Sequence, residues 1–192
     1  MFRKNKQQSG FTLIELLVVI GIMGVLMAIA IPSEINYRLK SELKTSVKDL
    51  RSMYWDAQSY SLAPRAKNIT AYEVTVTKSS APASPLTEKE CVALDDCPTD
   101  INKVTFGSNI YISDIKYLNC VSLPAVTDKL STYFLVGDNK TSGTMSFFDK
   151  VGGNPVKCDK IEIIMSSIAV SNYNFMITLD STNNSIDYAP AT

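Results

Sequence analysis

The sequence predicts an α+β fold in which one long N-terminal helix packs on an antiparallel β-sheet. Three observations lead to this fold class. An apolar run from Phe11 to Ile31 contains Glu15 as its one charged residue, an amphipathic helical pattern follows it, and short β-branched and aromatic runs fill the rest of the chain. A helix with an apolar stripe and a sheet with an apolar face can each cover the other, so together they form one core.

The apolar run is long enough to cross a membrane as a helix. At about 1.5 Å per residue it extends about 31 Å, close to the roughly 30 Å hydrocarbon core of a bilayer. Residues 1–10 carry Arg3, Lys4 and Lys6 and no acid. Because basic flanks stay on the cytoplasmic side, we expect one pass with the N-terminus inside.

The helical pattern continues beyond the apolar run and predicts one rod that reaches the region of Tyr60. Apolar residues recur at spacings of three and four on one face: Ile35, Leu39, Leu43, Val47, Leu50, Tyr54 and Ala57. Ala63-Pro64 should end the helix, because the residue before a proline is biased away from helical geometry.

The remainder of the chain reads as a single antiparallel sheet laid on the apolar stripe. Candidate strands are residues 72–77, 103–106, 110–115, 133–136, 144–148, 161–165 and 175–179. Residues 137–143 read as a hairpin loop and residues 152–155 as a second break. The stretch from Ser79 to Pro98 is the least regular part of the pattern.

One motif joins the basic leader to the apolar helix: Gly10-Phe11-Thr12-Leu13-Ile14-Glu15. A short basic leader, a glycine, a bulky apolar residue and a glutamate five residues beyond the glycine resemble the processing site of type IV prepilins and type II secretion pseudopilins. Pro32 also falls where many members of that family have a proline. The likeness in sequence covers residues 1 to about 35, and beyond them only the layout of helix then sheet is similar.

The resemblance implies a processing and assembly mechanism. A prepilin peptidase would cut between Gly10 and Phe11 and methylate the new amine of Phe11, and Glu15 would pair with that amine in a neighbouring subunit. The simpler alternative is that Glu15 favours the positive end of the helix dipole and extends to the membrane interface. Pro32 lacks a backbone donor and is a candidate helix kink.

The resemblance also implies a division of the chain and a function. Residues 1–10 would be a cleaved cytoplasmic leader, 11–31 the transmembrane and filament-core helix, 32–62 an amphipathic helix, and 63–192 an extracytoplasmic β-rich domain. The implied function is a structural subunit of a type IV pilus or type II secretion pseudopilus. The alternative is a minor pilin that acts as an adhesin or as a DNA-binding or uptake component.

The implied partners follow from that function. They are other copies or other pilin subunits, prepilin peptidase, an inner-membrane assembly platform, and the lipid bilayer before assembly. The subunit would lie in the inner membrane first and in an extracytoplasmic filament or at the cell surface afterwards.

The composition argues against an enzyme and against a nucleic-acid-binding protein. The chain has no histidine, which removes the usual general base and zinc ligand. Lys plus Arg and Asp plus Glu both number 19, so no net field favours nucleic acid. We therefore expect no cofactor, metal or catalytic residue, although carboxylate chemistry remains open.

Four cysteines, Cys91, Cys97, Cys120 and Cys158, fall in the part expected outside the cytoplasm, where disulfides persist. Three connectivities exist for four cysteines. We favour Cys91 with Cys97 and Cys120 with Cys158. A zinc site is the weaker alternative, because no C-x-x-C spacing and no histidine are present.

Two polar groups of residues leave their roles open. Lys40, Lys44, Lys48 and Arg51 form a basic ridge at helical spacing, which reads either as a solvated face or as a surface for anionic partners. Asp180, Asn183, Asn184 and Asp187 suggest a polar loop near the C-terminus. Turn chemistry is favoured there over calcium binding, because the glycine spacing of a calcium loop is absent.

Overall fold

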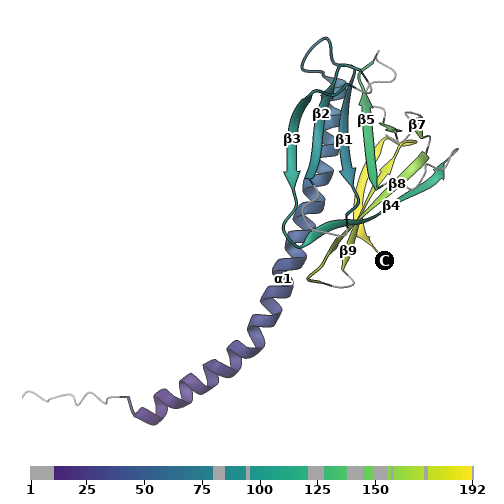
Figure 1. Ribbon diagram of the computed structural model, residues 1–192. Helices are drawn as coiled ribbons and strands as arrows, with labels where there is room; N and C mark the ends of the chain where they lie inside the picture. The colour runs from purple at the N-terminus through teal and green to yellow at the C-terminus, as the bar shows by residue number, and fades with distance from the viewer. Residues whose placement is uncertain are drawn as a thin grey trace, which may run out of the picture. The chain divides into compact units, whose positions relative to one another are not determined.

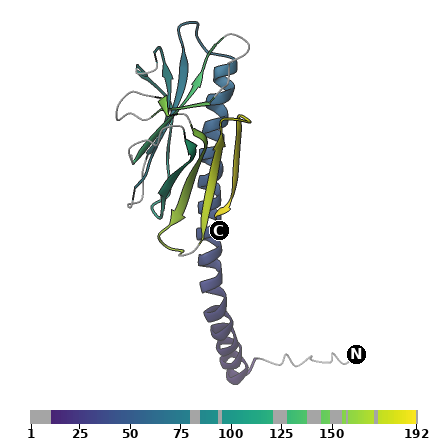
Figure 2. The same cartoon turned by 90° about the vertical axis from the view of Figure 1, so that its right-hand side faces the viewer.

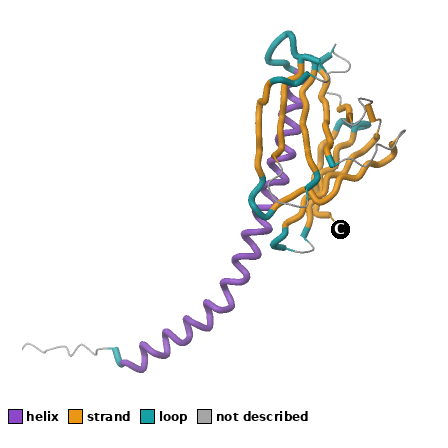
Figure 3. The backbone as a smooth tube through the Cα atoms, viewed as in Figure 1, coloured by secondary structure: helices purple, strands orange, loops and turns teal. Residues whose placement is uncertain are grey.

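The computed structural model describes residues 11–79, 85–93, 96–120, 128–137, 145–148, 155–156, 158–170 and 173–191. Within them the chain forms one helix and ten strands. Figure 1 labels most of these elements, and Figure 3 separates helix, strands and loops by colour. The backbone divides into two compact units, residues 1–38 and 39–192, and each is described by itself.

Helix α1 (Leu13–Leu62) is the one helix of the described residues. Leucine, which loses little side-chain freedom in a helix, is its commonest residue. Its last turn is closed by the Ala63 amide, which donates to the Ser59 carbonyl at 3.1 Å, just before Pro64. Every side chain described in the first turns, from Phe11 to Ile29, is exposed.

The strands form two antiparallel sheets rather than the single sheet that the sequence predicts. The six-stranded sheet has the order β3-β2-β1-β5-β6-β7 and the four-stranded sheet the order β10-β9-β8-β4. The bounds are β1 (Ala71–Thr77), β2 (Pro85–Cys91), β3 (Thr99–Thr105), β4 (Ile110–Cys120), β5 (Lys129–Leu135), β6 (Met145–Phe148), β7 (Pro155–Val156), β8 (Cys158–Ser167), β9 (Asn174–Asp180) and β10 (Ser185–Ala191).

The core lies between the later half of α1 and both sheets, which confirms the predicted α+β fold class. Figure 2 shows the yellow C-terminal strands of the four-stranded sheet in front of the later half of the helix and to its right, with the teal strands of the six-stranded sheet to its upper left. The helix contributes buried Leu43, Val47, Leu50, Met53, Tyr54 and Ala57. The Tyr54 ring packs edge-on against Phe134 of β5, with centroids 6.3 Å apart.

Burial of the predicted stripe is complete from Leu43 onward, whereas Leu39 is only half-buried. Ile35, which is 53% exposed, belongs to the other unit of the chain. Met53 completes the buried face and was outside the predicted stripe.

Three strands were missed by the sequence analysis, and each has a physical reason. β2 lies in the stretch predicted to be irregular, and its polar residues are ordered by pairing with β1 and β3. β10 lies where a polar loop was expected; it is an edge strand, where Pro190 is tolerated. β7 has two residues. Most of the predicted breaks at 137–143 and 152–155 lies outside the described residues.

The two sheets are tied together where β1 ends beside β4. The Lys78 ammonium donates to the Asp114 carboxylate at 2.9 Å, and the Ser79 amide donates to the Ile112 carbonyl at 3.1 Å. This hydrogen-bonded ion pair lowers the pKa of Asp114 and raises the pKa of Lys78. The contact therefore joins β1 to β4 across the boundary between the sheets.

The described part of the β domain contains two disulfides, Cys91–Cys97 and Cys120–Cys158. They have the pairing that the sequence analysis favours. Cys120 and Cys158 lie directly opposite each other in the register of β4 and β8. Cys91 ends β2, and its bond to Cys97 closes the turn that leads towards β3.

Non-reducing peptide mapping of the purified protein should therefore return two intramolecular disulfides, Cys91 with Cys97 and Cys120 with Cys158, and no free thiol. A parallel digest of reduced protein is the control, because both cross-linked peptides must disappear from it. Recovery of a peptide that joins Cys91 to Cys120 would contradict this pairing.

Candidate assembly site

The N-terminus of α1 is built as a capping box around Thr12 and Glu15. The Thr12 amide and hydroxyl donate to Glu15 Oε2 at 3.1 and 3.0 Å, and the Glu15 amide donates to the Thr12 hydroxyl oxygen at 3.4 Å. A Thr-x-x-Glu box satisfies backbone donors that have no partner within the helix. Glu15 therefore stabilises the start of its own helix, and this role is separate from the predicted pairing with an amine of a neighbouring subunit.

The geometry of the box leaves part of the Glu15 carboxylate available. Both hydrogen bonds from Thr12 end on Oε2. A carboxylate has about four acceptor positions on two oxygens. An ammonium group of another chain can therefore reach Oε1 while the box stays closed. Gly10 lies outside the described residues, and Phe11, which follows it, is exposed.

The surface that follows the box is apolar on every side. From Leu13 to Ile29 the large apolar side chains are exposed. Within the described residues α1 is the one helix whose length and composition allow it to cross a membrane. A Cβ added at Gly21 or Gly24 would meet nothing within 4 Å, so both positions are open to a close helix approach.

Pro32 lies inside α1, and the helix is assigned without interruption from Leu13 to Leu62. The side chains of residues 30–33 lie outside the described set. The kink expected at Pro32 therefore stays a prediction.

The basic ridge is partly tied to the sheet instead of being wholly solvated. The Lys40 ammonium lies 5.0 Å from the centre of the Tyr173 ring. Arg51 contacts Trp55 and Tyr188. Lys44 and Lys48, between these two residues, are exposed. The ridge thus contacts the residue just before β9 at one end and β10 at the other.

The polar residues near the C-terminus form the turn between β9 and β10. Asp180 Oδ1 accepts bonds from the amides of Thr182 and Asn183, at 2.9 and 3.2 Å. The Thr182 hydroxyl also donates to this oxygen and lowers the pKa of Asp180. Asn184 adopts a φ of 53°, which asparagine tolerates well. The turn accounts for these side chains, and Asp187 follows on β10.

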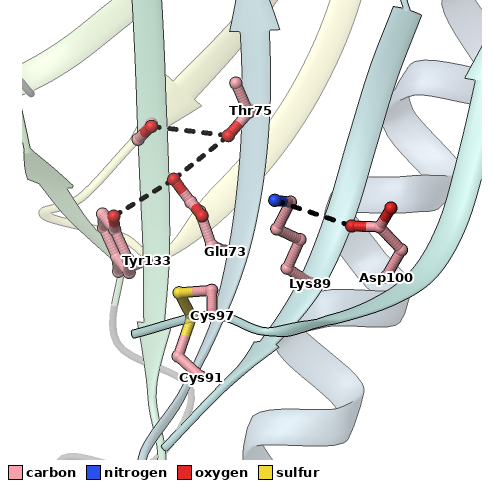
Figure 4. A network of polar contacts seen from close by, with 8 residues as sticks. Glu73, Thr75, Lys89, Cys91, Cys97, Asp100 and Tyr133 are labelled. Atoms are coloured by element: carbon pink, nitrogen blue, oxygen red, sulfur yellow. Dashed lines mark hydrogen bonds and ion pairs between the residues drawn. A yellow bond between two sulfur atoms is a disulfide. The ribbon is translucent and has the colours of Figure 1, made fainter. Parts of the chain in front are cut away.

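A buried polar network lies on the six-stranded sheet next to a disulfide. Figure 4 shows the Glu73 carboxylate directed at Tyr133 and Thr75, whose hydroxyls both donate to Glu73 Oε1 at 3.1 Å. A Glu73 oxygen and the sulfurs of Cys91 and Cys97 lie within 4.8 Å of one another. The two sulfurs are bonded to each other, so the three residues form a disulfide beside a hydrogen-bonded carboxylate rather than an assembled metal site.

Several residues that matter here were missed by sequence reasoning. The Thr-x-x-Glu spacing of Thr12 and Glu15 is a readable signature of a helix start. Glu73 and Glu88, both 1% exposed, gave no signal, because alternating polar residues in a strand read as its solvated face.

A capped helix that begins with a largely apolar, exposed segment and whose later half is buried against antiparallel sheets is the layout of a pilin-like α+β protein. Residues 5–31 match the family model described as the prokaryotic N-terminal methylation motif. The chain is 40% identical over 58 residues to the type IV major pilin protein PilA of Myxococcus xanthus (strain DK1622), across 30% of this chain and 26% of that protein. It is 41% identical over 54 residues to a fimbrial protein of Pseudomonas aeruginosa, across 28% of this chain and 35% of that protein.

The fold and the similarity of this N-terminal segment together support a type IV pilin-like prepilin. The alignments reach only about a third or less of the relatives' own length. No solved structure gives a significant match to the chain.

Proposed function

We propose that this chain is a structural subunit of a type IV pilus or a type II secretion pseudopilus. The observation that carries the proposal is the combination of the methylation motif at residues 5–31 with an exposed apolar helix that begins at a Thr12–Glu15 box. An apolar surface of this extent is stable in lipid or against similar helices, and not in water. A filament of subunits packed through their helices would cover it.

The subunit would be made as a single-pass precursor in the inner membrane, with the basic leader in the cytoplasm. Prepilin peptidase would cut after Gly10 and methylate Phe11, and an inner-membrane platform would then move the subunit into an extracytoplasmic filament. Glu15 would pair with the Phe11 amine of a neighbour. The chain itself would be a substrate and building block, and not an enzyme.

The alternative function, a minor pilin that works as an adhesin or in DNA uptake, keeps the same helix and processing. It would require a recognition surface on the β domain. The methylation motif does not distinguish the two roles, whereas the abundance of the chain in sheared filaments would.

Mass spectrometry of assembled protein tests this proposal at its first step. The mature chain should begin at a methylated Phe11 and lack residues 1–10. Gly10→Val should leave the precursor uncut in the membrane, because the peptidase must hold an unhindered, extended peptide at this position.

Gly21→Ala is the matched control, since it changes a glycine in the same segment where an added Cβ meets no atom within 4 Å. Its cutting should be normal. An intact Met1 on assembled protein would contradict the proposed function.

A further inference from the structure

An open groove lies between the later half of α1 and the edge strand β10. It has a volume of about 260 Å³ and is lined by Lys48, Arg51, Ser52, Trp55 and Tyr188. The first four residues come from successive turns of the helix, and Tyr188 comes from the strand. The groove therefore belongs to the exposed face of the amphipathic segment, away from the buried stripe.

The Arg51 side chain is held in this groove by three contacts. Its Nε donates to the Ile186 carbonyl at 3.1 Å. Its guanidinium carbon lies 4.1 Å from the centre of the Trp55 ring and 5.3 Å from that of Tyr188. Stacking and the Nε bond fix the plane of the guanidinium, so little freedom is lost when its remaining N–H groups bind an oxyanion.

The groove carries positive charge with no acid in its lining. Among the residues that the structure describes, the ion pairs are Lys78–Asp114 and Lys89–Asp100, so Lys48 and Arg51 belong to neither. A fixed guanidinium beside an exposed ammonium and the Ser52 hydroxyl is suited to a carboxylate, which binds a guanidinium through two parallel bonds.

The aromatic content of the groove indicates a protein partner. Trp55 is 48% exposed, and it is the single tryptophan of the chain. Tryptophan, tyrosine and arginine are the residues that dominate binding energy at protein interfaces. A small anion would neutralise the charges but leave the Trp55 ring in water.

We propose that the α1–β10 groove is a contact surface for a second copy of this chain, which inserts an acidic side chain between Lys48 and Arg51 and covers Trp55. The inference rests on the proposed function, because filament assembly brings copies together. Charge complementarity supports the second copy as the occupant. Without residues 1–10, which hold Arg3, Lys4 and Lys6 and no acid, the processed chain has 19 acids and 19 − 3 = 16 bases, so the surface outside the groove carries an excess of acid that can meet the groove of the next copy.

The experiment compares charge-reversal variants in the full-length protein. Lys48→Glu changes an exposed side chain outside the Arg51 contacts, so the fold should be kept. Arg51→Glu removes the central cation. Lys103→Glu, at an exposed lysine of β3, is the matched control. Membrane insertion and removal of residues 1–10 should be normal in all three.

Sheared-filament yield should fall about tenfold or more for Lys48→Glu and Arg51→Glu, and should not fall for Lys103→Glu; tenfold corresponds to about 1.4 kcal/mol per contact. Trp55 fluorescence should shift to shorter wavelength when unaltered protein assembles. Carbodiimide, which joins amines directly to carboxylates, should link Lys48 to an acid of another copy.

Two failures are distinguishable. If unaltered protein is processed but yields no filaments, the proposed function and this interface both fail. If unaltered filaments form, and Lys48→Glu and Arg51→Glu form them equally well with no shift in Trp55 emission, only the groove proposal is overturned. Equal loss of filaments in Lys103→Glu would also overturn it, because the effect would then be one of overall charge.

Discussion

Sheared filaments should be almost absent from cells that make Glu15→Gln in place of the unaltered chain, although the protein is still inserted and cut after Gly10. The substitution removes the charge and keeps the shape of the side chain. Glutamine can also accept a bond from the Thr12 amide, so the capping box is preserved. The change therefore isolates the charge of Glu15 from its role at the helix start.

The expected loss has an electrostatic cause. An unpaired ammonium at Phe11 of the neighbour would be stranded in an apolar contact, at a cost of roughly 3 to 5 kcal/mol. This cost recurs at every added subunit, so it acts on the whole filament. Insertion should be unaffected or slightly better, because an uncharged side chain costs less in hydrocarbon.

The measurement is a side-by-side assay of processed protein in membranes and of filaments sheared from cells. Thr12→Val is the matched control: it removes the hydroxyl of the box and keeps the Glu15 charge. Its filament yield should stay above that of Glu15→Gln. Normal filament yield from Glu15→Gln would mean that the carboxylate only caps the helix.

The free energy of unfolding of the β domain should fall as the pH rises from about 5 to about 8. The cause is Glu88, which is 1% exposed on the same face of β2 as buried Leu86. Among the described residues, its Oε1 has no hydrogen-bond partner. Burial, with a smaller contribution from Asp56, raises the pKa of Glu88 to about 7.

The direction of this pH dependence follows from how tightly Glu88 binds its proton in the folded and unfolded states. A carboxyl with a raised pKa binds its proton more tightly in the folded state, so its stabilising contribution is complete below the ordinary pKa near 4.5 and is lost by about pH 7. At about 1.4 kcal/mol per pKa unit, the change is on the order of 2 to 3 kcal/mol. The charged groups that face Glu88 are Asp56 on α1, Glu90 on β2 and Arg65 after the helix, and only Arg65 opposes the shift.

Denaturant unfolding of the purified protein at pH 5, 6, 7 and 8 measures this dependence. Glu88→Gln should be nearly independent of pH in this window and more stable than the unaltered protein at pH 8. Glu90→Gln is the control on the same strand, and it should keep most of the slope. A pH slope that is unchanged in Glu88→Gln would rule out this carboxyl as its source.

The fold class was predictable because its signals are local. An apolar run, a helical stripe and a proline stop define α1 closely, and its end at Leu62 needs only Pro64. The division into two sheets was not predictable, because it depends on which strands pair. β5, for example, pairs with distant β1, whereas β4 pairs with β8. Such pairings depend on contacts between residues far apart in the chain, which the spacing of apolar residues along the sequence does not encode.

The functional residues likewise fall into two groups, those that the sequence identifies and those that required the structure. Glu15 and Phe11 are identified by a motif, whereas the role of Thr12 was missed although its spacing to Glu15 is a readable signal. The α1–β10 groove required the structure, because Tyr188 reaches Arg51 from a strand at the far end of the chain. Glu88 required it too: between Thr87 and Lys89 it reads as a surface residue, and only the structure shows that it is buried.

The Cys120–Cys158 disulfide has a consequence for a subunit under mechanical load. It closes a stretch with a sequence separation of 38, which includes β5, β6 and β7. Fully extended, this stretch would add about 130 Å to the chain at roughly 3.3 to 3.6 Å per residue. With the disulfide intact, a pull on the two ends of the subunit is transmitted through the Cys120–Cys158 bond, so the covalent segment that contains β5 to β7 cannot be drawn out even when the strands around it separate.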